Sequence, residues 1–379
     1  MLYVSSQQYS PGLENVIAAT SSICTLDLER HVIVLRGYNL VELATKTTYE
    51  DVAYLTLYGH LPNRREYMEF TSRLREYRDI PKEVVEILEK MSRDSHPLLM
   101  MKAAVATLAA YDPELEDNSL EANFRKAERI IAKLATVTAA AYNIPNGRGY
   151  IRPKNDLPHT SNLFYMITGR EPNDLEARIF EQSFTMYIEH ELAVSTFAAR
   201  VVASSMTDMY GAVISALAAL KGPLHGRANE MAAKMIIEIS SPENAEKYIQ
   251  RILDRRERVM GFGHRVYRRG IDPRAEKCRE MLKELSDAKG SNYYEIVERV
   301  VEIMQAKKNL YPNVDFYIGP LYHLLGIPIE LYTPIFAASR IAGWTAHIAE
   351  QQANNRLFRP RARYEGPRDL KFIPLDERE

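Results

Sequence analysis

The chain has 379 residues, of which 46% are apolar and 26% charged, and its formal net charge is −1. These values are typical of a soluble globular protein large enough for two domains, and they give no reason to expect a nucleic acid or an anionic membrane as a partner. Only two cysteines occur, Cys24 and Cys278, which argues against a disulfide framework or a thiolate metal site and favours a cytoplasmic location. The first ten residues lack a secretory signal pattern, and the most apolar run, residues 212–220, is too short to span a bilayer.

The N-terminal region predicts a small β element. Residues 25–28 and 31–35 are two short, mostly apolar runs separated by the turn Glu29-Arg30, a pattern typical of paired strands. The turn-forming sequence Gly37-Tyr38-Asn39 is expected to end the second strand.

From there on, apolar side chains recur with helical spacing along almost the whole chain. Residues 191–221 are rich in small side chains, which let helices pack closely, so this segment is predicted to lie at the centre of the molecule or at a subunit interface. Residues 310–319, with proline and several aromatic residues, are expected to be irregular, and residues 359–379 to be extended. Helices are predicted at 41–46, 49–58, 64–77, 81–92, 98–111, 120–142, 161–168, 174–189, 228–240, 243–258, 273–286, 292–307, 319–325 and 333–352.

These elements predict an all-α fold with a large helical domain, a small helical domain and a minor β element near the N-terminus. Glycine and proline breaks mark the two borders of the predicted small domain, residues 226–318. Residues 1–225 and 319–379 are then the two parts of the large domain, the second ending in a C-terminal arm.

One loop combines glycine, histidine and arginine. Residues 258–274 place His264 between Gly261-Phe-Gly263 and several arginines. Glycine lets a ligand come close to the backbone, and guanidinium groups bind carboxylates and phosphates through two hydrogen bonds. An anion-binding loop is one interpretation. A solvated basic loop is the other. A lone Gly-x-Gly is weak evidence for a ligand site and is not a dinucleotide fingerprint.

Two further histidines lie at breaks between helices. His225 precedes the helix predicted at 228–240, where the positive end of the helix dipole would lower the pKa of the imidazole and keep it neutral, able to donate a hydrogen bond to a carbonyl group. His190 follows the helix predicted at 174–189. The alternatives are structural: a helix cap for His225, and contact with the last helix carbonyls for His190. A metal site of His190, His225 and His264 lacks the usual ligand spacing.

Asp315 is a candidate base, because Val314 and Phe316 flank it and apolar neighbours raise the pKa of a carboxyl group. An ordinary turn aspartate is the alternative. Arg274, Arg340 and Arg359 lie on or beside predicted helix ends and are candidate carboxylate ligands. Considered by themselves, Arg340 and Arg359 are more typical of surface charges. Together the arginines indicate a di- or tricarboxylate ligand, and the histidines and aspartate indicate proton transfer beside a carbonyl group.

Five stretches resemble the signature motifs of citrate synthases, in the family's order and along nearly the whole chain. The start of the chain is also similar to the shorter archaeal and Gram-positive type. The five stretches are His190-Glu-Leu-Ala-Val-Ser-Thr196; Gly222-Pro-Leu-His-Gly-Arg-Ala-Asn229; Gly261-Phe-Gly-His-Arg-Val-Tyr267 with Asp272-Pro-Arg274; Asn313-Val-Asp-Phe-Tyr317; and Ser339-Arg-Ile-Ala-Gly-Trp344 with Arg359-Pro-Arg361.

The resemblance implies a homodimer whose subunits each have a large domain and a small domain that closes over substrate. It implies an acyltransferase reaction in which acetyl-CoA condenses with oxaloacetate and the citryl thioester is hydrolysed to citrate and coenzyme A. Coenzyme A enters as the thioester substrate, and no metal or redox cofactor is implied.

The resemblance also implies a role for each candidate residue. Asp315 would take a proton from the acetyl methyl group, His225 would hydrogen-bond the thioester oxygen, and His264 would polarise the oxaloacetate carbonyl and protonate it. The residues implied to bind oxaloacetate are His190, Arg274, Arg340 and, from across the dimer, Arg359. Those implied to contact coenzyme A are Arg258, Val259, Met260, Gly261 and Phe262.

The motifs leave alternatives open. A 2-methylcitrate synthase would use propionyl-CoA with the same residues, and one methylene in an apolar pocket is worth only about 1–3 kcal/mol. A non-catalytic helical carboxylate-binding protein and a metal-dependent hydrolase are the other two. The loop from His264 to Arg274 is one residue longer than the usual pattern, and a bulge at Gly270 would absorb the extra residue.

Overall fold

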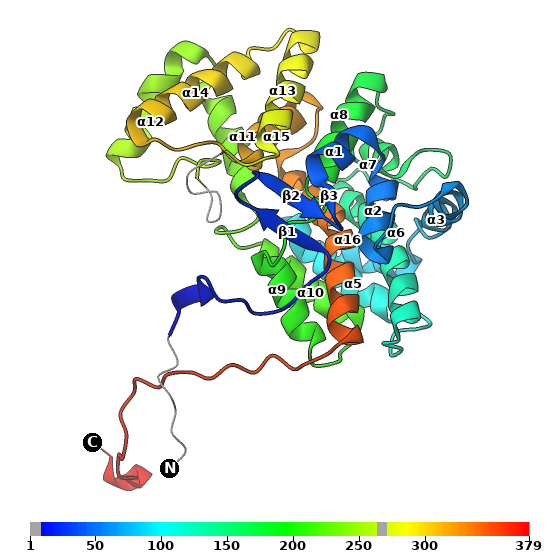
Figure 1. The fold of residues 1–379 in the computed structure, drawn as a ribbon, viewed down its shortest axis with the longest axis vertical. Helices are drawn as coiled ribbons and strands as arrows, with labels where there is room; N and C mark the ends of the chain where they lie inside the picture. Colours follow the sequence, from blue (N-terminus) through cyan, green and yellow to red (C-terminus); the bar gives the residue numbers. More distant parts are fainter. Residues whose placement is uncertain (1–8, 264–270, 379) are drawn as a thin grey trace.

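The computed structural model describes residues 9–263 and 271–378, and in these ranges it is a helical protein with one small sheet (Figure 1). The sheet has three antiparallel strands, β1 (Cys24–Asp27), β2 (Val32–Leu35) and β3 (Tyr38–Asn39), with Cys24 opposite Leu35. The two predicted strands are confirmed. The turn sequence expected to end them instead supplies β3, because the chain reverses at Gly37 and pairs Tyr38 with Leu35.

Sixteen α-helices and four short 3₁₀ helices lie within the described residues. The α-helices are α1 (Leu40–Lys46), α2 (Tyr49–Tyr58), α3 (Arg64–Glu76), α4 (Lys82–Lys90), α5 (Pro97–Ala109), α6 (Leu120–Asn143), α7 (His159–Thr168), α8 (Asp174–Thr185), α9 (Val194–Ala203), α10 (Met209–Leu220), α11 (Ala228–Ile239), α12 (Ala245–Asp254), α13 (Ala275–Lys289), α14 (Tyr293–Lys308), α15 (Val314–Leu324) and α16 (Tyr332–Ala353). The 3₁₀ helices are Pro11–Leu13, Pro242–Asn244, Ile329–Leu331 and Leu375–Glu377. The all-α prediction is confirmed.

Local sequence determines where several helices begin. Thr48, Asn63 and Asn173 each accept a hydrogen bond from a backbone amide of the first turn, and the acidic residue three positions later bonds back to the cap amide. This reciprocal pairing satisfies amide groups that have no partner inside the helix.

Two predicted boundaries near the site are wrong. Helix α8 ends at Thr185, where residues 186–188 form tight turns instead of continuing to 189. Residues 314–319, predicted to be irregular, are the first part of α15, which begins after the cap Asn313 and contains Pro320. Helix α15 packs against α11 and α13, and Gly319 lets α15 approach α11 closely. Tertiary packing therefore overrides the weak helical pattern of this stretch.

Helix α16 is the structural centre of the large helical body (Figure 1). It is buried along nearly its whole length and packs against α2, α5, α6, α8, α9, α10 and α11. Helices α9 and α10 pack against each other and against α16, in agreement with the close packing predicted for residues 191–221, while a role at a subunit interface stays a prediction. A residue on α16 thus lies within reach of many other segments.

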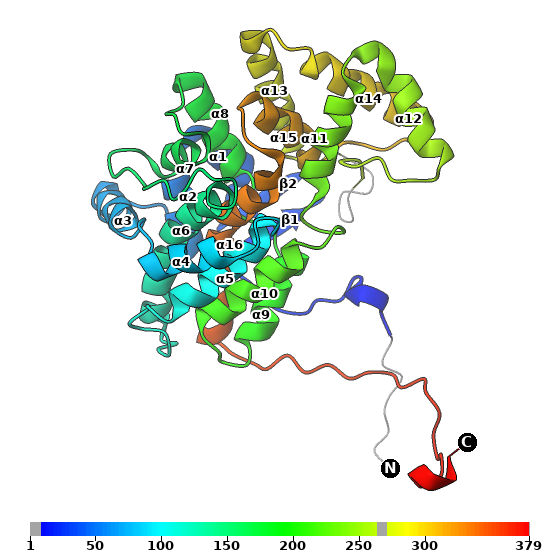
Figure 2. The ribbon, with the colours of Figure 1, turned by 180° about the vertical axis from the view of Figure 1, so that it is seen from behind.

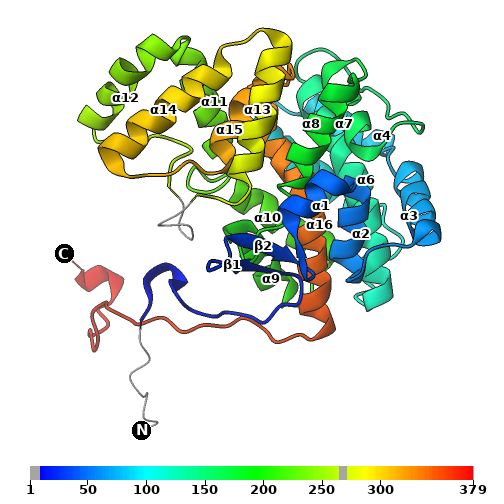
Figure 3. The ribbon, with the colours of Figure 1, turned by 45° about the horizontal axis from the view of Figure 1, so that its top comes forward.

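Helices α11–α15 form a group on one side of the molecule, visible from both faces (Figures 1 and 2). Here α12 packs against α14, and α13 against α15. The division into domains at residues 226 and 318 stays a prediction. The described N-terminal residues and the chain after α16 both extend away from the helical body (Figure 3). Within the described ranges, no helix has the length and apolar character needed to cross a membrane.

Candidate active site

Asp315 lies in the first turn of α15, where its backbone amide donates to Asn313 Oδ1 at 3.1 Å. Its carboxylate Oδ1 accepts a hydrogen bond of 2.7 Å from the Tyr187 hydroxyl, which in turn accepts one of 3.5 Å from Asn229 Nδ2. These partners orient the carboxylate from three separate segments: the turn after α8, the first turn of α11 and α15 itself. Asp315 is therefore a positioned residue at a helix start, not the ordinary turn aspartate of the alternative interpretation.

The environment of Asp315 raises the pKa of its carboxyl to about 6, chiefly because the surrounding protein replaces water. The hydrogen bond from Tyr187 and the charges of Arg274 and Arg340 lower this pKa, while Asp272 raises it. Near pH 7 the group is therefore ionised but close to its pKa, which suits a general base. The upward shift predicted from the apolar neighbours is confirmed.

His225 is held on one side of its ring. The backbone amide of Ser195 donates to Nε2 at 3.3 Å, and the Ser195 hydroxyl lies 2.8 Å from the same nitrogen. Because an amide can only donate, Nε2 is an acceptor, and the proton of the neutral ring is on Nδ1.

The pKa of His225 is lowered to about 4, first by burial and second by the charge of Arg340. The predicted direction is confirmed, and the contribution of the helix dipole stays a prediction. Helix α11 begins at Ala228 with Arg227 as its cap, so His225 does not cap it, and burial dominates.

Arg340 lies in the middle of α16 and is almost completely buried, 1% exposed. Its Nε donates to the backbone oxygen of Tyr187, and its guanidinium lies 4.6 Å from the Phe336 ring centroid. Its Nη1 is buried and has no hydrogen-bond partner among the described residues. The expectation of a charge at a helix end or on the surface is wrong, and an unpaired buried donor is suited to an anionic ligand.

Arg274 caps α13 and is buried. Its guanidinium forms two hydrogen bonds with Asp272, Nε to Oδ1 at 3.0 Å and Nη2 to Oδ2 at 2.8 Å, and Nη1 lies 3.4 Å from the Met186 oxygen. Asp272 Oδ2 also accepts a hydrogen bond from the Val314 amide at 3.3 Å. The pair therefore joins Arg274 to the helix start that carries Asp315.

His190 is buried in the segment between α8 and α9, four residues after Met186. Its amide donates to Glu189 Oε1 at 2.9 Å, and that oxygen lies 3.2 Å from His347 Nε2. Because α8 ends at Thr185, the predicted position of His190 directly after the helix is wrong, and it lies five residues past the helix end.

The loop predicted to contact coenzyme A lies beside the segment that leads into α15. Gly261 and Gly263 have φ of 82° and 76°, as expected for glycine in a tight turn. Asn313 donates from its amide to the Gly261 oxygen at 2.9 Å and from Nδ2 to the Gly263 oxygen at 3.1 Å. The Phe262 and Phe316 rings are 4.6 Å apart. Arg258, Val259 and Met260 precede this contact in the same loop.

Replacing Gly261 by alanine is expected to lower the free energy of unfolding by about 2–4 kcal/mol, from the positive φ and from overpacking. An added Cβ would lie 2.7 Å from the Phe316 Cβ and 2.9 Å from its Cα. Gly263→Ala is the matched control, because its φ is similar but its nearest neighbour, Leu310 Cδ2, is 3.9 Å away. Urea unfolding of both variants checks the prediction, and equal losses would contradict the role assigned to close packing.

One face of α16 supplies much of the site. Phe336, Arg340 and Trp344 recur every four residues and therefore share a face. The Phe336 ring lies 4.5 Å from the Tyr187 ring and 6.3 Å from the His225 ring. Sequence analysis missed the contributions of Tyr187, Ser195, Asp272, Phe336 and Trp344. The i, i+4, i+8 spacing around Arg340 is the signal that would have indicated Phe336 and Trp344.

Of two further predicted site residues, one lies outside the described residues and the other lies away from this cluster. His264 and Gly270 lie outside the described residues, so the proposed histidine role, the three-histidine metal site and the bulge stay untested predictions. Arg359 is exposed and donates to the Pro360 oxygen at 3.4 Å. It belongs to the segment that leaves the body after α16 (Figure 3).

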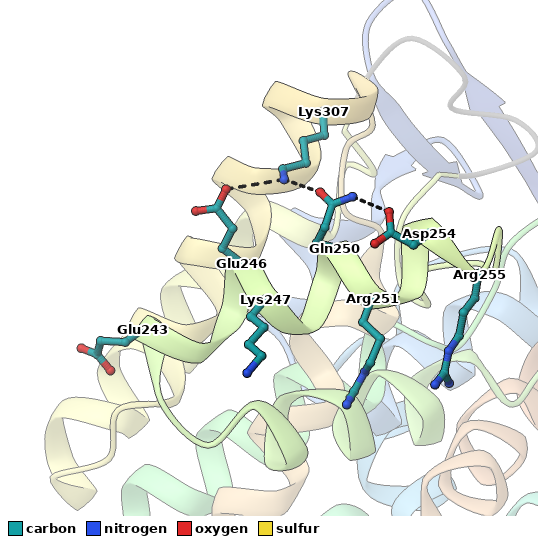
Figure 4. A pocket seen from close by; sticks show the side chains of 8 residues that line it. All are labelled: Glu243, Glu246, Lys247, Gln250, Arg251, Asp254, Arg255 and Lys307. Atoms are coloured by element: carbon teal, nitrogen blue, oxygen red, sulfur yellow. Dashed lines mark hydrogen bonds and ion pairs between the residues drawn. The ribbon is translucent and has the colours of Figure 1, made fainter.

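A surface hollow of 680 Å³ lies on α12 and near the end of α14, apart from the cluster. Some of its polar groups bond one another: Lys307 Nζ donates to Gln250 Oε1 at 2.6 Å, and Gln250 Nε2 donates to Asp254 Oδ1 at 2.7 Å (Figure 4). It contains none of the buried titratable groups described above, so the Asp315 cluster is the better candidate for chemistry.

Comparison with known proteins agrees with the resemblance. The model of the family described as citrate synthase, C-terminal domain, matches residues 12–361. The citrate/2-methylcitrate synthase of Bacillus subtilis strain 168 is 43% identical over 363 residues, 96% of this chain and 98% of its own.

Two solved structures have the same fold. The citrate synthase of Pyrobaculum aerophilum superposes with a TM-score of 0.89 at 40% identity, covering 97% of this chain and 95% of the other. The ternary complex of citrate synthase from Thermoplasma acidophilum with carboxymethyl coenzyme A and oxaloacetate gives a TM-score of 0.92 at 32% identity, covering 98% and 100%.

Proposed function

The chain belongs to the citrate synthase family, and from this premise we propose that it condenses acetyl-CoA with oxaloacetate and hydrolyses the resulting citryl thioester to citrate and coenzyme A. The observation that carries the proposal is the half-buried carboxylate of Asp315, with a pKa of about 6, bonded to Tyr187 at 2.7 Å. A base of this kind beside a neutral histidine and a buried arginine fits enolisation of a thioester next to a dicarboxylate.

The first step forms the nucleophile. Asp315 takes a proton from the methyl group of acetyl-CoA, while the Nδ1–H of His225 hydrogen-bonds the thioester oxygen, where negative charge develops. The lowered pKa of His225 supports a neutral donor. The predicted contact residues of coenzyme A, 258–262, lie in the loop that is hydrogen-bonded to Asn313, the cap of α15, so the same segment would position both the thioester and its base.

The second step joins the two substrates. The enol carbon forms a bond to the keto carbon of oxaloacetate, and the keto oxygen receives a proton, a role we propose for His264. His190, Arg274 and Arg340 hold the two carboxylates. Water then adds to the thioester carbonyl and the coenzyme A thiol leaves. No resident cofactor takes part in this scheme. Closure of the small domain, residues 226–318, would exclude bulk water until hydrolysis.

Release of free thiol tests the reaction. With acetyl-CoA, release is expected only when oxaloacetate is present. Release from propionyl-CoA at a higher rate than from acetyl-CoA would identify a 2-methylcitrate synthase, an activity that the name of the Bacillus subtilis relative gives beside citrate synthase. Binding of oxaloacetate without thiol release from either thioester would instead support the non-catalytic carboxylate-binding protein. Loss of activity after addition of a chelator would support the metal-dependent hydrolase.

We further propose a cytoplasmic homodimer in which Arg359 completes the site of the partner subunit. Two observations support it. The segment that carries Arg359 extends away from its own helical body (Figure 3), and the two cysteines are free and buried, which suits a reducing compartment.

Mixing of two inactive variants tests the exchange. Arg359→Met and Asp315→Asn chains, unfolded and refolded together, should regain about a quarter of wild-type turnover, because half of the dimers are mixed and one of their two sites is intact. If Arg359 served its own subunit, every site would carry a defect and mixing would restore nothing. The oligomeric state is checked independently by light scattering.

A further inference from the structure

Two buried side chains, Trp344 and Ser195, link α16 to the half-buried His225. Trp344 Nε1 donates to Ser195 Oγ at 3.2 Å, and Ser195 Oγ lies 2.8 Å from His225 Nε2. Trp344 and Ser195 are both 0% exposed. Ser195 is the second residue of α9, so its amide, which has no partner within the helix, also points at His225 Nε2, at 3.3 Å.

The direction of these hydrogen bonds follows from the chemistry of the groups. An indole N–H can only donate, so the Ser195 oxygen accepts from Trp344. The hydroxyl has a single proton, which is then directed at the other hydrogen-bond partner of the oxygen among the described residues, His225 Nε2. With the amide and the hydroxyl of Ser195 both donating, Nε2 has no room for a proton of its own.

We propose that Trp344 is a positioning residue for His225, acting through Ser195 to hold the imidazole in the tautomer that has its proton on Nδ1. The inference rests on the proposed function, in which that Nδ1–H donates to the thioester oxygen. Trp344 touches neither substrate in this scheme. Without its N–H, the Ser195 hydroxyl can turn and accept a hydrogen bond from an Nε2–H, opposed only by the long 3.3 Å bond from the Ser195 amide. In that tautomer the ring presents an acceptor where the reaction needs a donor.

The position of Trp344 makes the proposal testable without substrate. It is the only tryptophan in the chain, so Trp344→Phe removes the only indole while keeping an aromatic ring on α16. Nitrogen-15 NMR of histidine-labelled protein reports the tautomer of His225, assigned by loss of its signals in His225→Asn. The wild type is expected to show the Nδ1–H form, and Trp344→Phe a mixture of both tautomers.

Turnover provides the second readout. Trp344→Phe is expected to lower kcat about five- to tenfold, the effect of one hydrogen bond, with the KM for oxaloacetate unchanged. Ser195→Ala should lower kcat at least as much. If Trp344 acts through Ser195, the double variant should be no slower than Ser195→Ala alone. Multiplied losses, or an unchanged tautomer in Trp344→Phe, would overturn the proposal.

A packing control separates tautomer from stability. Ile341→Val removes one methylene from a neighbouring buried position of α16 and should lower stability while leaving the His225 tautomer as in the wild type. A shifted tautomer in this variant would mean that loosened packing alone is sufficient. If the wild type releases no thiol from either thioester, the proposed function fails, and the NMR comparison still decides whether Trp344 holds His225.

Discussion

Asp315→Asn is expected to lower thiol release by about 10³-fold or more, the usual scale for removing a positioned general base, and to make the protein more stable at neutral pH. The substitution keeps the shape of the side chain and an oxygen that can accept the hydrogen bond from Tyr187. It removes a charge that burial disfavours. Activity and stability therefore change in opposite directions at this one position.

The stability gain should depend on pH in a defined window. The pKa of Asp315 is about 6 in the folded protein, compared with 3.8 for an aspartate without tertiary contacts. Because the folded value is higher, the carboxyl disfavours folding once it must ionise, so its cost grows as the pH rises from about 4 to 6 and is constant above that. The half-buried position limits the expected gain at pH 7.5 to about 1–2 kcal/mol, with none near pH 4.

Urea unfolding of the wild type and of Asp315→Asn at several pH values measures this difference. Asp27→Asn is the matched control, because hydrogen bonds from the amide and guanidinium of Arg30 lower the pKa of Asp27. At pH values above the ordinary pKa of aspartate, this substitution should therefore reduce stability. A variant at position 315 that is less stable than the wild type at pH 7.5 would contradict the role of burial. The same pKa predicts that wild-type thiol release falls as the pH drops below about 6.

Arg340→Met is expected to raise the KM for oxaloacetate about 100-fold or more. The reason is that losing one member of a buried charge pair costs about 2–5 kcal/mol of binding free energy. The guanidinium is buried, with Nη1 unpaired among the described residues, so a substrate carboxylate would supply its missing partner. Oxaloacetate should raise the Tm of the wild type by mass action, and this shift should be nearly lost in the variant.

Arg78→Met controls for the loss of a buried arginine. Arg78 is also 1% exposed, but its Nη1 donates to the backbone oxygens of Lys154 and Leu157 at 2.7 and 2.8 Å. This variant should lose stability and keep the oxaloacetate-dependent shift in Tm. An unchanged shift in Arg340→Met, or an equal loss in both variants, would argue against Arg340 as the carboxylate ligand.

Much of this protein was predictable from local sequence, because helices, strands and their caps depend on neighbouring residues. Apolar spacing predicted most helices to within a few positions, and Val314 and Phe316 indicated the raised pKa of Asp315. The failures have one cause. Residues 314–319 look irregular by themselves, yet packing against α11 and α13 makes them helical, and Arg340 looks like a surface charge until α16 is placed at the centre of the molecule.

The sequence by itself determined the all-α class, the family motifs and the residues that can transfer protons or bind carboxylates. Only the tertiary structure decided which partners orient them. Tyr187 meets Asp315 across 128 positions of the chain, and Ser195 meets Trp344 across 149. A hydrogen bond forms only within a few tenths of an ångström of its ideal length, and no local pattern specifies such a distance between remote segments. Packing of α16 against the neighbouring turns fixes these distances. It thereby positions His225 to act as a hydrogen-bond donor and Asp315 to act as a base.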